Sequence, residues 1–187
     1  MPNIALVHSH EQTIYDEIAR HTPDGFETVG IDVRGPLDEQ IALAASTEYL
    51  ILSGTQLPDE VLKASGPRLL QILSAGWDFL NFSLIRELEV PVANNGGANS
   101  WAVADHTLLL LLAVYHRLIE ADAATRSGDW GGPLNGMNAF ELAGKTVGVL
   151  GIGSIGRQVA KRLHAFDAKV QYHDVQRLTR EQEQALG

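Results

Sequence analysis

Six residues near the C-terminal end carry the spacing Gly-x-Gly-x-x-Gly: Gly151-Ile152-Gly153-Ser154-Ile155-Gly156. The spacing alone is weak evidence in a chain that contains 18 glycines. Its context is stronger, because an apolar strand pattern at 146–150 precedes it and a helical pattern at 157–163 follows it. An acidic residue, Asp174, stands at the end of the next predicted strand. Together these features form the fingerprint of a dinucleotide-binding βαβ unit.

Each part of the fingerprint has a physical role. Gly151 permits a tight turn out of the strand, Gly153 leaves room for a pyrophosphate, and Gly156 lets the helix pack closely on the strand. The helix N-terminus offers N–H groups and partial positive charge to the phosphates. Asp174 can accept hydrogen bonds from ribose hydroxyls and would repel a 2′-phosphate, so we expect NAD as the cofactor. The nearby cation Arg177 leaves NADP as an alternative cofactor. The alternative is that the glycines only shape a turn and that Asp174 is a solvated strand end.

The bulk composition narrows the classes of partner. The 187 residues include 23 acidic and 14 basic ones, and the formal charge of −9 disfavours nucleic acid and anionic membranes. The absence of cysteine excludes a disulfide framework and a thiolate metal site, and the histidines and carboxylates show no spacing that requires a metal. The N-terminus does not resemble a signal peptide, and the longest apolar run, 108–114, is far shorter than the ~20 residues that span a bilayer. We therefore expect a cytoplasmic protein.

The first half of the chain alternates strand and helix patterns, which predicts an α/β fold with a parallel sheet covered on both faces. Five strands within about 95 residues would make a complete flavodoxin-like unit. The predicted strands are Ile4–Val7, Phe26–Val33, Tyr49–Leu52, Leu69–Leu73 and Val90–Ala93, and the predicted helices are Glu11–Arg20, Leu37–Ala45, one that starts near Pro58, and Leu84–Leu88.

The second half begins with a loop rich in Asn and Gly at 94–99. We expect one long helix from Asn99 or Ser100 to about Arg126, then a loop to Asn138 and a βαβ unit at about 145–174. The predicted domains are therefore 1–98, and 99–187 as the start of a Rossmann domain. A doubly wound dinucleotide domain has about six strands and this segment has two, so we expect either that a partner supplies the rest or, preferably, that the chain is a fragment.

Three blocks of sequence, in this order, resemble the family of D-2-hydroxyacid dehydrogenases, which includes phosphoglycerate dehydrogenases and glyoxylate/hydroxypyruvate reductases. The blocks are Gln71–Asp78, Ala98–Thr107 and Phe140–Gly153. The resemblance covers the whole chain. It implies a flavodoxin-like substrate domain followed by a Rossmann domain, NAD as cofactor, and interconversion of a 2-hydroxy acid and a 2-keto acid by hydride transfer.

The resemblance also assigns roles to individual residues. It implies that the backbone of Ser74, Ala75, Gly76 and Trp77 holds the substrate carboxylate, and that Ser53-Gly54-Thr55 forms the other wall of the cleft. Val103 would line the nicotinamide side and Asn99 the substrate side, Thr107 would approach the cofactor, and Ser154 and Ile155 would lie along the pyrophosphate. The loop at 76–78 is shorter than the common form of the family, and Trp77 is bulkier than the usual residue, so the resemblance does not identify the substrate.

The family's catalytic Arg, acidic residue and His have no counterpart among these 187 residues, so we expect them beyond Gly187 and expect this chain alone to be inactive. We interpret His106 as a structural helix residue, and His8 and His10 as loop residues near the cleft. Trp130 is expected to anchor a loop. The apolar run Leu108–Leu112 is expected to be core or a dimer-facing stripe in a homodimer. The alternatives to an enzyme are a non-catalytic, NAD-sensing and dimerising protein of the corepressor kind, and an inactive truncated product.

Overall fold

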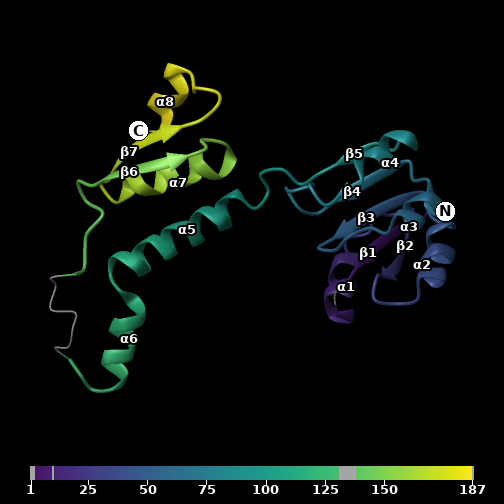
Figure 1. The fold of residues 1–187 in the computed structure, drawn as a ribbon, viewed down its shortest axis with the longest axis horizontal. Helices are drawn as coiled ribbons and strands as arrows, with labels where there is room; N and C mark the ends of the chain where they lie inside the picture. Colours follow the sequence, from purple (N-terminus) through teal and green to yellow (C-terminus); the bar gives the residue numbers. More distant parts are fainter. Residues whose placement is uncertain (1–2, 10, 131–137, 187) are drawn as a thin grey trace. The chain divides into compact units, whose positions relative to one another are not determined.

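The computed structural model describes residues 3–9, 11–130 and 138–186. The chain forms two compact units, Met1–Gly96 and Gly97–Gly187, and each is described by itself (Figure 1).

The first unit is a five-stranded parallel sheet with the strand order β2-β1-β3-β4-β5. This is the flavodoxin-like order, so the predicted fold class is confirmed. His8 at the end of β1 pairs with Ser53 at the end of β3, and Leu52 pairs with Ile72 of β4. The strands are β1 (Asn3–His8), β2 (Glu27–Asp32), β3 (Tyr49–Ser53), β4 (Leu69–Ile72) and β5 (Val92–Ala93).

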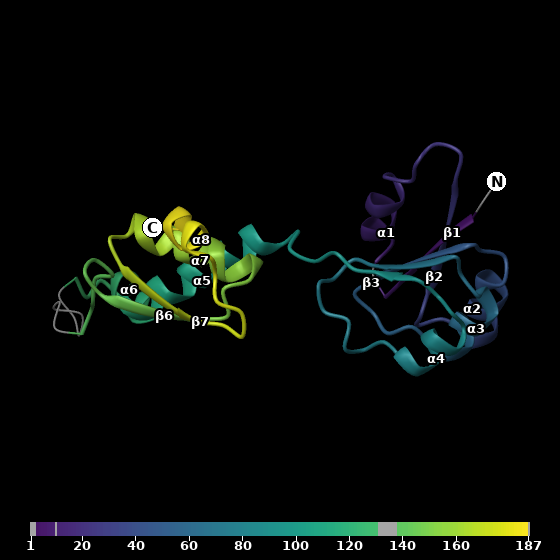
Figure 2. The same cartoon turned by 90° about the horizontal axis from the view of Figure 1, so that it is seen from above.

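Helices cover both faces of this sheet, with α1 on one side and α2, α3 and α4 on the other (Figure 2). The central strands are consequently buried on both faces, and Val7, Leu50 and Leu70 are fully enclosed. The side chain of Asn81 accepts a hydrogen bond from the Leu84 amide at 3.2 Å, which caps the start of α4. The helices are α1 (Gln12–Ala19), α2 (Leu37–Ala44), α3 (Asp59–Ser65) and α4 (Phe82–Glu87).

In the second unit two parallel strands pair directly with each other, β6 (Thr146–Leu150) and β7 (Lys169–His173). Helix α7 (Ser154–Ala165) connects them in the chain. Helix α7 lies between the strand pair and helix α5 (Ser100–Tyr115) (Figure 1). Their shared core contains Ala104 and Leu108 of α5 and Val159 and Leu163 of α7. Helices α6 (Leu118–Arg126) and α8 (Arg180–Leu186) complete the described elements of this unit.

The prediction of a single helix from Ser100 to about Arg126 is wrong, because the structure contains two helices, α5 and α6. Arg117 between them adopts φ of 49°, a left-handed conformation that ends a helix. The carbonyl of Tyr115 accepts a hydrogen bond from the Phe140 amide at 3.0 Å, and the two rings meet edge to face at 6.0 Å. This contact with a segment far along the chain gives the Tyr115 carbonyl a partner outside the helix.

The apolar run on α5 divides between core and surface. Leu108 is buried and Leu111 and Leu112 are partly buried, whereas Leu109 and Leu110 are each 54% exposed. No single described helix is long and apolar enough to cross a membrane. Helices α5 and α6 satisfy that test only as a pair, and they are bent by 63° at their junction.

Candidate functional site

The turn between β6 and α7 has a shape that requires glycine at positions 151 and 156. Gly151 adopts φ of 89°, where a side chain would be strained. A Cβ atom at Gly156 would overlap the carbonyl oxygen of Gly151, so only glycine permits this approach of helix to turn. A Cβ atom at Gly153 would meet nothing within 4 Å. The turn therefore leaves open space at its middle glycine, where a bound pyrophosphate would need it.

The peptide groups of Ile152 are held from two sides. The amide of Ile152 donates to Asp174 Oδ2 at 2.6 Å, and the carbonyl of Ile152 accepts from Arg157 Nε at 3.1 Å. The Ile152 side chain is buried beneath the turn. Helix α7 then begins at Ser154, with Gly153 as an N-cap that has no side chain to bond the first N–H groups. Those N–H groups have no partner within the helix and favour an anion.

Asp174 follows β7 and is oriented by backbone amides. Its Oδ1 accepts from the Gln176 amide at 3.1 Å, while Oδ2 accepts from Ile152. The amide of Gln176, followed by that of Ile152, holds the pKa of the Asp174 carboxyl below its usual range. The structure therefore joins the two predicted halves of the nucleotide site, and the carboxylate is ionised and in contact with the turn.

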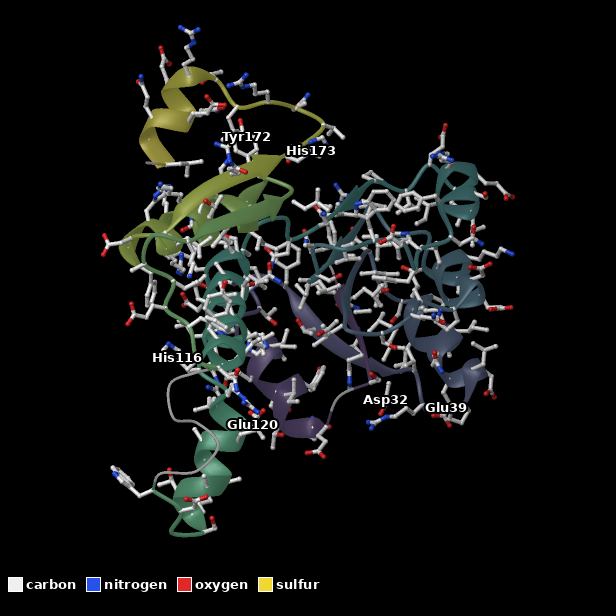
Figure 3. The ribbon with its side chains drawn as sticks, turned by 60° about the vertical axis from the view of Figure 1, so that its left-hand side comes forward. Asp32, Glu39, His116, Glu120, Tyr172 and His173 are labelled. Atoms are coloured by element: carbon white, nitrogen blue, oxygen red, sulfur yellow. The ribbon has the colours of Figure 1, made fainter. Side chains whose placement is uncertain are left out.

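A pocket of about 550 Å³ adjoins Asp174 at the end of β7. Within it, Arg177 Nε donates to Glu183 Oε1 at 2.9 Å, and Tyr172 Oη donates to the same oxygen at 2.7 Å. Figure 3 shows Tyr172 and His173 where β7 approaches the segment that leads to α8. The sequence analysis missed Tyr172 and Glu183, because neither belongs to a motif and the contact forms only when α8 folds back on β7. The pocket is lined by Val170, Gln171, Tyr172, His173, Asp174, Arg177 and Glu183.

Helix α5 carries the predicted cofactor residues Val103 and Thr107, and the predicted substrate residue Asn99 lies at its start. Val103 is half-buried, and Thr107 is exposed and donates its hydroxyl to the Val103 carbonyl at 2.7 Å. Asn99 forms the N-cap of α5 without a side-chain hydrogen bond. Arg162 of α7 bonds Asp105 of α5 at 2.5 Å, and this ion pair ties the helix that bears Val103 to the helix of the glycine turn.

The predicted substrate residues of the first unit lie at the carboxyl ends of the adjacent strands β3 and β4. Ser53 is buried at the end of β3. In the loop after β4, the Ser74 hydroxyl donates to the Gly76 carbonyl at 2.8 Å, and Nδ2 of Asn94 donates to the Ala75 carbonyl at 2.8 Å. Asn94, which sequence analysis missed, thus fixes the loop from the end of β5.

The bulky Trp77 has a local packing partner. Its ring meets Phe82 of α4 edge to face at 5.3 Å, and it is half exposed. The sequence analysis singled out three histidines. The buried His8 packs against Tyr15 with 5.1 Å between the ring centroids, and His106 is exposed on α5. His10 lies outside the described residues. Among the residues that the structure describes, no group of three or more His, Asp or Glu could hold a metal ion.

The sequence of the second unit matches a known family. Residues 108–187 match the model of the NAD-binding domain of D-isomer specific 2-hydroxyacid dehydrogenases. The chain belongs to the D-isomer specific 2-hydroxyacid dehydrogenase family. The cofactor of this dehydrogenase domain is NAD, and the open turn at Gly153 with the carboxylate of Asp174 fits that molecule.

Relatives of known sequence agree with this family. The chain is 36% identical over 131 residues to a glyoxylate reductase of Thermofilum pendens, an alignment that covers 68% of this chain and 39% of the relative. It is 31% identical over 168 residues to a protein of Staphylococcus aureus named as a 2-hydroxyacid dehydrogenase, covering 87% of this chain and 52% of the relative. The chain therefore spans about half, or less, of the length of these dehydrogenases.

A solved structure has the same fold. The pyruvate reductase of Chlamydomonas reinhardtii superposes with a TM-score of 0.75 at 25% sequence identity, and the match covers 99% of this chain and 55% of that one. Both units of this chain thus have counterparts in one known structure.

Proposed function

We propose that this chain is part of an NAD-dependent oxidoreductase that interconverts a 2-hydroxy acid and a 2-keto acid. The observation that carries the proposal is the contact between Asp174 and the Ile152 amide, which joins an open glycine turn to the carboxylate that we propose binds the ribose. The family and the relatives named as glyoxylate reductase and 2-hydroxyacid dehydrogenase support the class of reaction.

The chain's own residues would bind and orient the reactants. Backbone N–H groups at Ser74–Trp77 would bind the substrate carboxylate, and Asn94 would hold that loop in place. The N-terminus of α7 would bind the pyrophosphate and Asp174 the adenosine ribose. When bound, the nicotinamide supplies or accepts the hydride.

We place the proton-transferring histidine, its acidic partner and the carboxylate-binding arginine outside these 187 residues. In the family resemblance those three residues follow the segment present here. The alignments also cover only 39% and 52% of these relatives, which leaves room for them. The 187-residue chain alone would then bind NAD without turnover.

We also propose that the complete protein is a homodimer that associates through α5 and α6. Val114 is 74% exposed and Ile119 is 77% exposed, and with Leu109 and Leu110 they give these helices a large apolar surface. The same surface favours the second candidate function, an NAD-sensing protein whose output is dimerisation.

The test combines binding and turnover. The purified chain is titrated with NAD by calorimetry and is then supplied with NADH and glyoxylate, pyruvate or hydroxypyruvate. We expect NAD binding and no oxidation of NADH, with turnover restored in the longer protein. Turnover by the 187 residues would contradict the placement of the catalytic residues. NAD-dependent dimerisation of the longer protein, without turnover on any hydroxy acid, would favour the sensing function.

A further inference from the structure

A cation close to the carboxylate proposed to bind the ribose could select the phosphorylated cofactor, and Arg177 is a candidate for that role. It lies three residues after Asp174 and lines the same pocket. An arginine can pair with a phosphate through two parallel N–H groups, so an available Arg177 would offset the repulsion between Asp174 and a 2′-phosphate. The position of its guanidinium group therefore matters for cofactor choice.

In the structure this guanidinium is engaged by Glu183 through two of its nitrogens. Nε of Arg177 donates to Oε1 at 2.9 Å, and Nη2 donates to Oε2 at 3.4 Å. Both carboxylate oxygens of Glu183 are thus directed at Arg177. The side chain of Arg177 is 82% exposed and that of Glu183 is 29% exposed, so the carboxylate is the better anchored partner.

Glu183 is anchored by the elements around it. Tyr172 Oη donates to Glu183 at 2.7 Å and accepts from the Leu178 amide at 3.1 Å, which ties the carboxylate to β7 and to the connecting segment. Helix α8 is fixed at its start by reciprocal bonds. The Thr179 amide donates to Gln182 Oε1 at 3.1 Å, and the Gln182 amide donates to Thr179 Oγ1 at 3.2 Å.

We propose that Glu183 is a specificity-determining residue that holds Arg177 away from a 2′-phosphate and so enforces the choice of NAD over NADP. The inference rests on the proposed cofactor site. Discrimination between NAD and NADP would then have two causes. The negative charge of Asp174 repels the 2′-phosphate, and the ion pair with Glu183 keeps Arg177 from binding it. The pKa of the Glu183 carboxyl is lowered, first by the bond from Arg177 and then by that from Tyr172, so the carboxylate stays ionised at neutral pH.

The test is the substitution Glu183→Gln in the 187-residue chain, with NAD and NADP titrated separately by calorimetry. Glutamine keeps an oxygen for Tyr172 but removes the charge that holds Arg177. We expect NADP affinity to rise about fivefold to tenfold, the gain from one charge-assisted phosphate contact, with NAD affinity little changed. Raising the salt concentration should reduce the gain, because the contact is exposed.

Three controls make the result specific. Glu181→Gln removes an equal charge from the same helix and should leave the NADP to NAD ratio unchanged. Glu183→Gln combined with Arg177→Ala should abolish the gain, because the released cation is gone. Thermal unfolding shows whether each variant keeps its fold.

The outcomes separate this inference from the cofactor site itself. Normal NAD binding with an unchanged ratio in a folded Glu183→Gln chain would overturn the role of Glu183 and leave the site intact. An equal gain in the Glu181→Gln chain would overturn it too, because net charge alone would then explain the effect. Failure of the unsubstituted chain to bind NAD would overturn the cofactor site and this inference with it.

Discussion

The carboxylate of Asp174 accepts a 2.6 Å hydrogen bond from the amide of Ile152, which lies 22 residues earlier in the chain. The bond connects the end of β7 to the middle of the glycine turn. It fixes the carboxylate beside the site where a pyrophosphate would lie, and it leaves the N–H groups at the start of α7 for the phosphates. This hydrogen bond therefore connects the fold of the second unit to the proposed NAD site.

Alanine at two glycines of the turn should affect different properties, stability at Gly156 and NAD binding at Gly153. Gly156→Ala should destabilise the chain by more than about 2 kcal/mol, because its Cβ would overlap the carbonyl of Gly151. Gly153→Ala should change stability by less than about 1 kcal/mol, since its Cβ meets no protein atom and its φ of −71° suits alanine. It should still weaken NAD binding by about tenfold or more, because the added Cβ would occupy the proposed pyrophosphate site.

Urea unfolding and NAD titration of both variants test this contrast. Gly148→Ala is the matched control, because its Cβ would also meet nothing and the position lies within β6, away from the turn. Full NAD affinity in the Gly153→Ala chain would show that the ligand does not pass over this residue.

The charge of Asp174 gives a pH dependence with a definite sign. Its pKa is depressed in the folded chain, so its contribution to stability is present above its unfolded pKa of about 3.9 and is lost as the pH falls through the lower folded value. The difference in unfolding free energy between the unsubstituted chain and Asp174→Asn should therefore be constant from about pH 6 to pH 8 and shrink below about pH 4. Urea unfolding across this range measures it. If this difference in unfolding free energy varied between pH 6 and pH 8, a group other than Asp174 would be responsible for the titration.

The hydrogen bond from Asn94 to Ala75 should control the order of the proposed substrate loop. Asn94→Ala should speed amide hydrogen exchange at residues 75–77 about threefold to fivefold, as expected for the loss of one hydrogen bond of about 1 kcal/mol. Asn95→Ala is the control, because its backbone amide, which the substitution retains, bonds Ser74. Equal exchange rates in the two variants would show that the loop is held by other contacts.

Local patterns predicted much of the fold and of the nucleotide site. The strands of the first unit are short apolar runs, and their alternation with helices is sufficient to indicate a parallel sheet. The glycine turn and Asp174 could be found because their spacing follows from the shape of a βαβ unit. Their contact through the Ile152 amide is the local consequence of that shape.

The features that sequence analysis missed depend on contacts between distant segments. The break between α5 and α6 accompanies a bond from Phe140 to Tyr115, and nothing in the apolar pattern around Arg117 signals it. Likewise, Glu183 meets Tyr172 and Arg177 only because α8 returns to the end of β7. Such pairings require the tertiary structure.

The most direct test of the nucleotide site is an NMR titration of the ¹⁵N-labelled chain with NAD. We predict that the largest amide shifts fall at residues 152–156 and at Asp174, because those amides lie in the proposed sites of the pyrophosphate and the ribose. Saturable binding that leaves these amides unshifted and perturbs residues elsewhere would contradict the account.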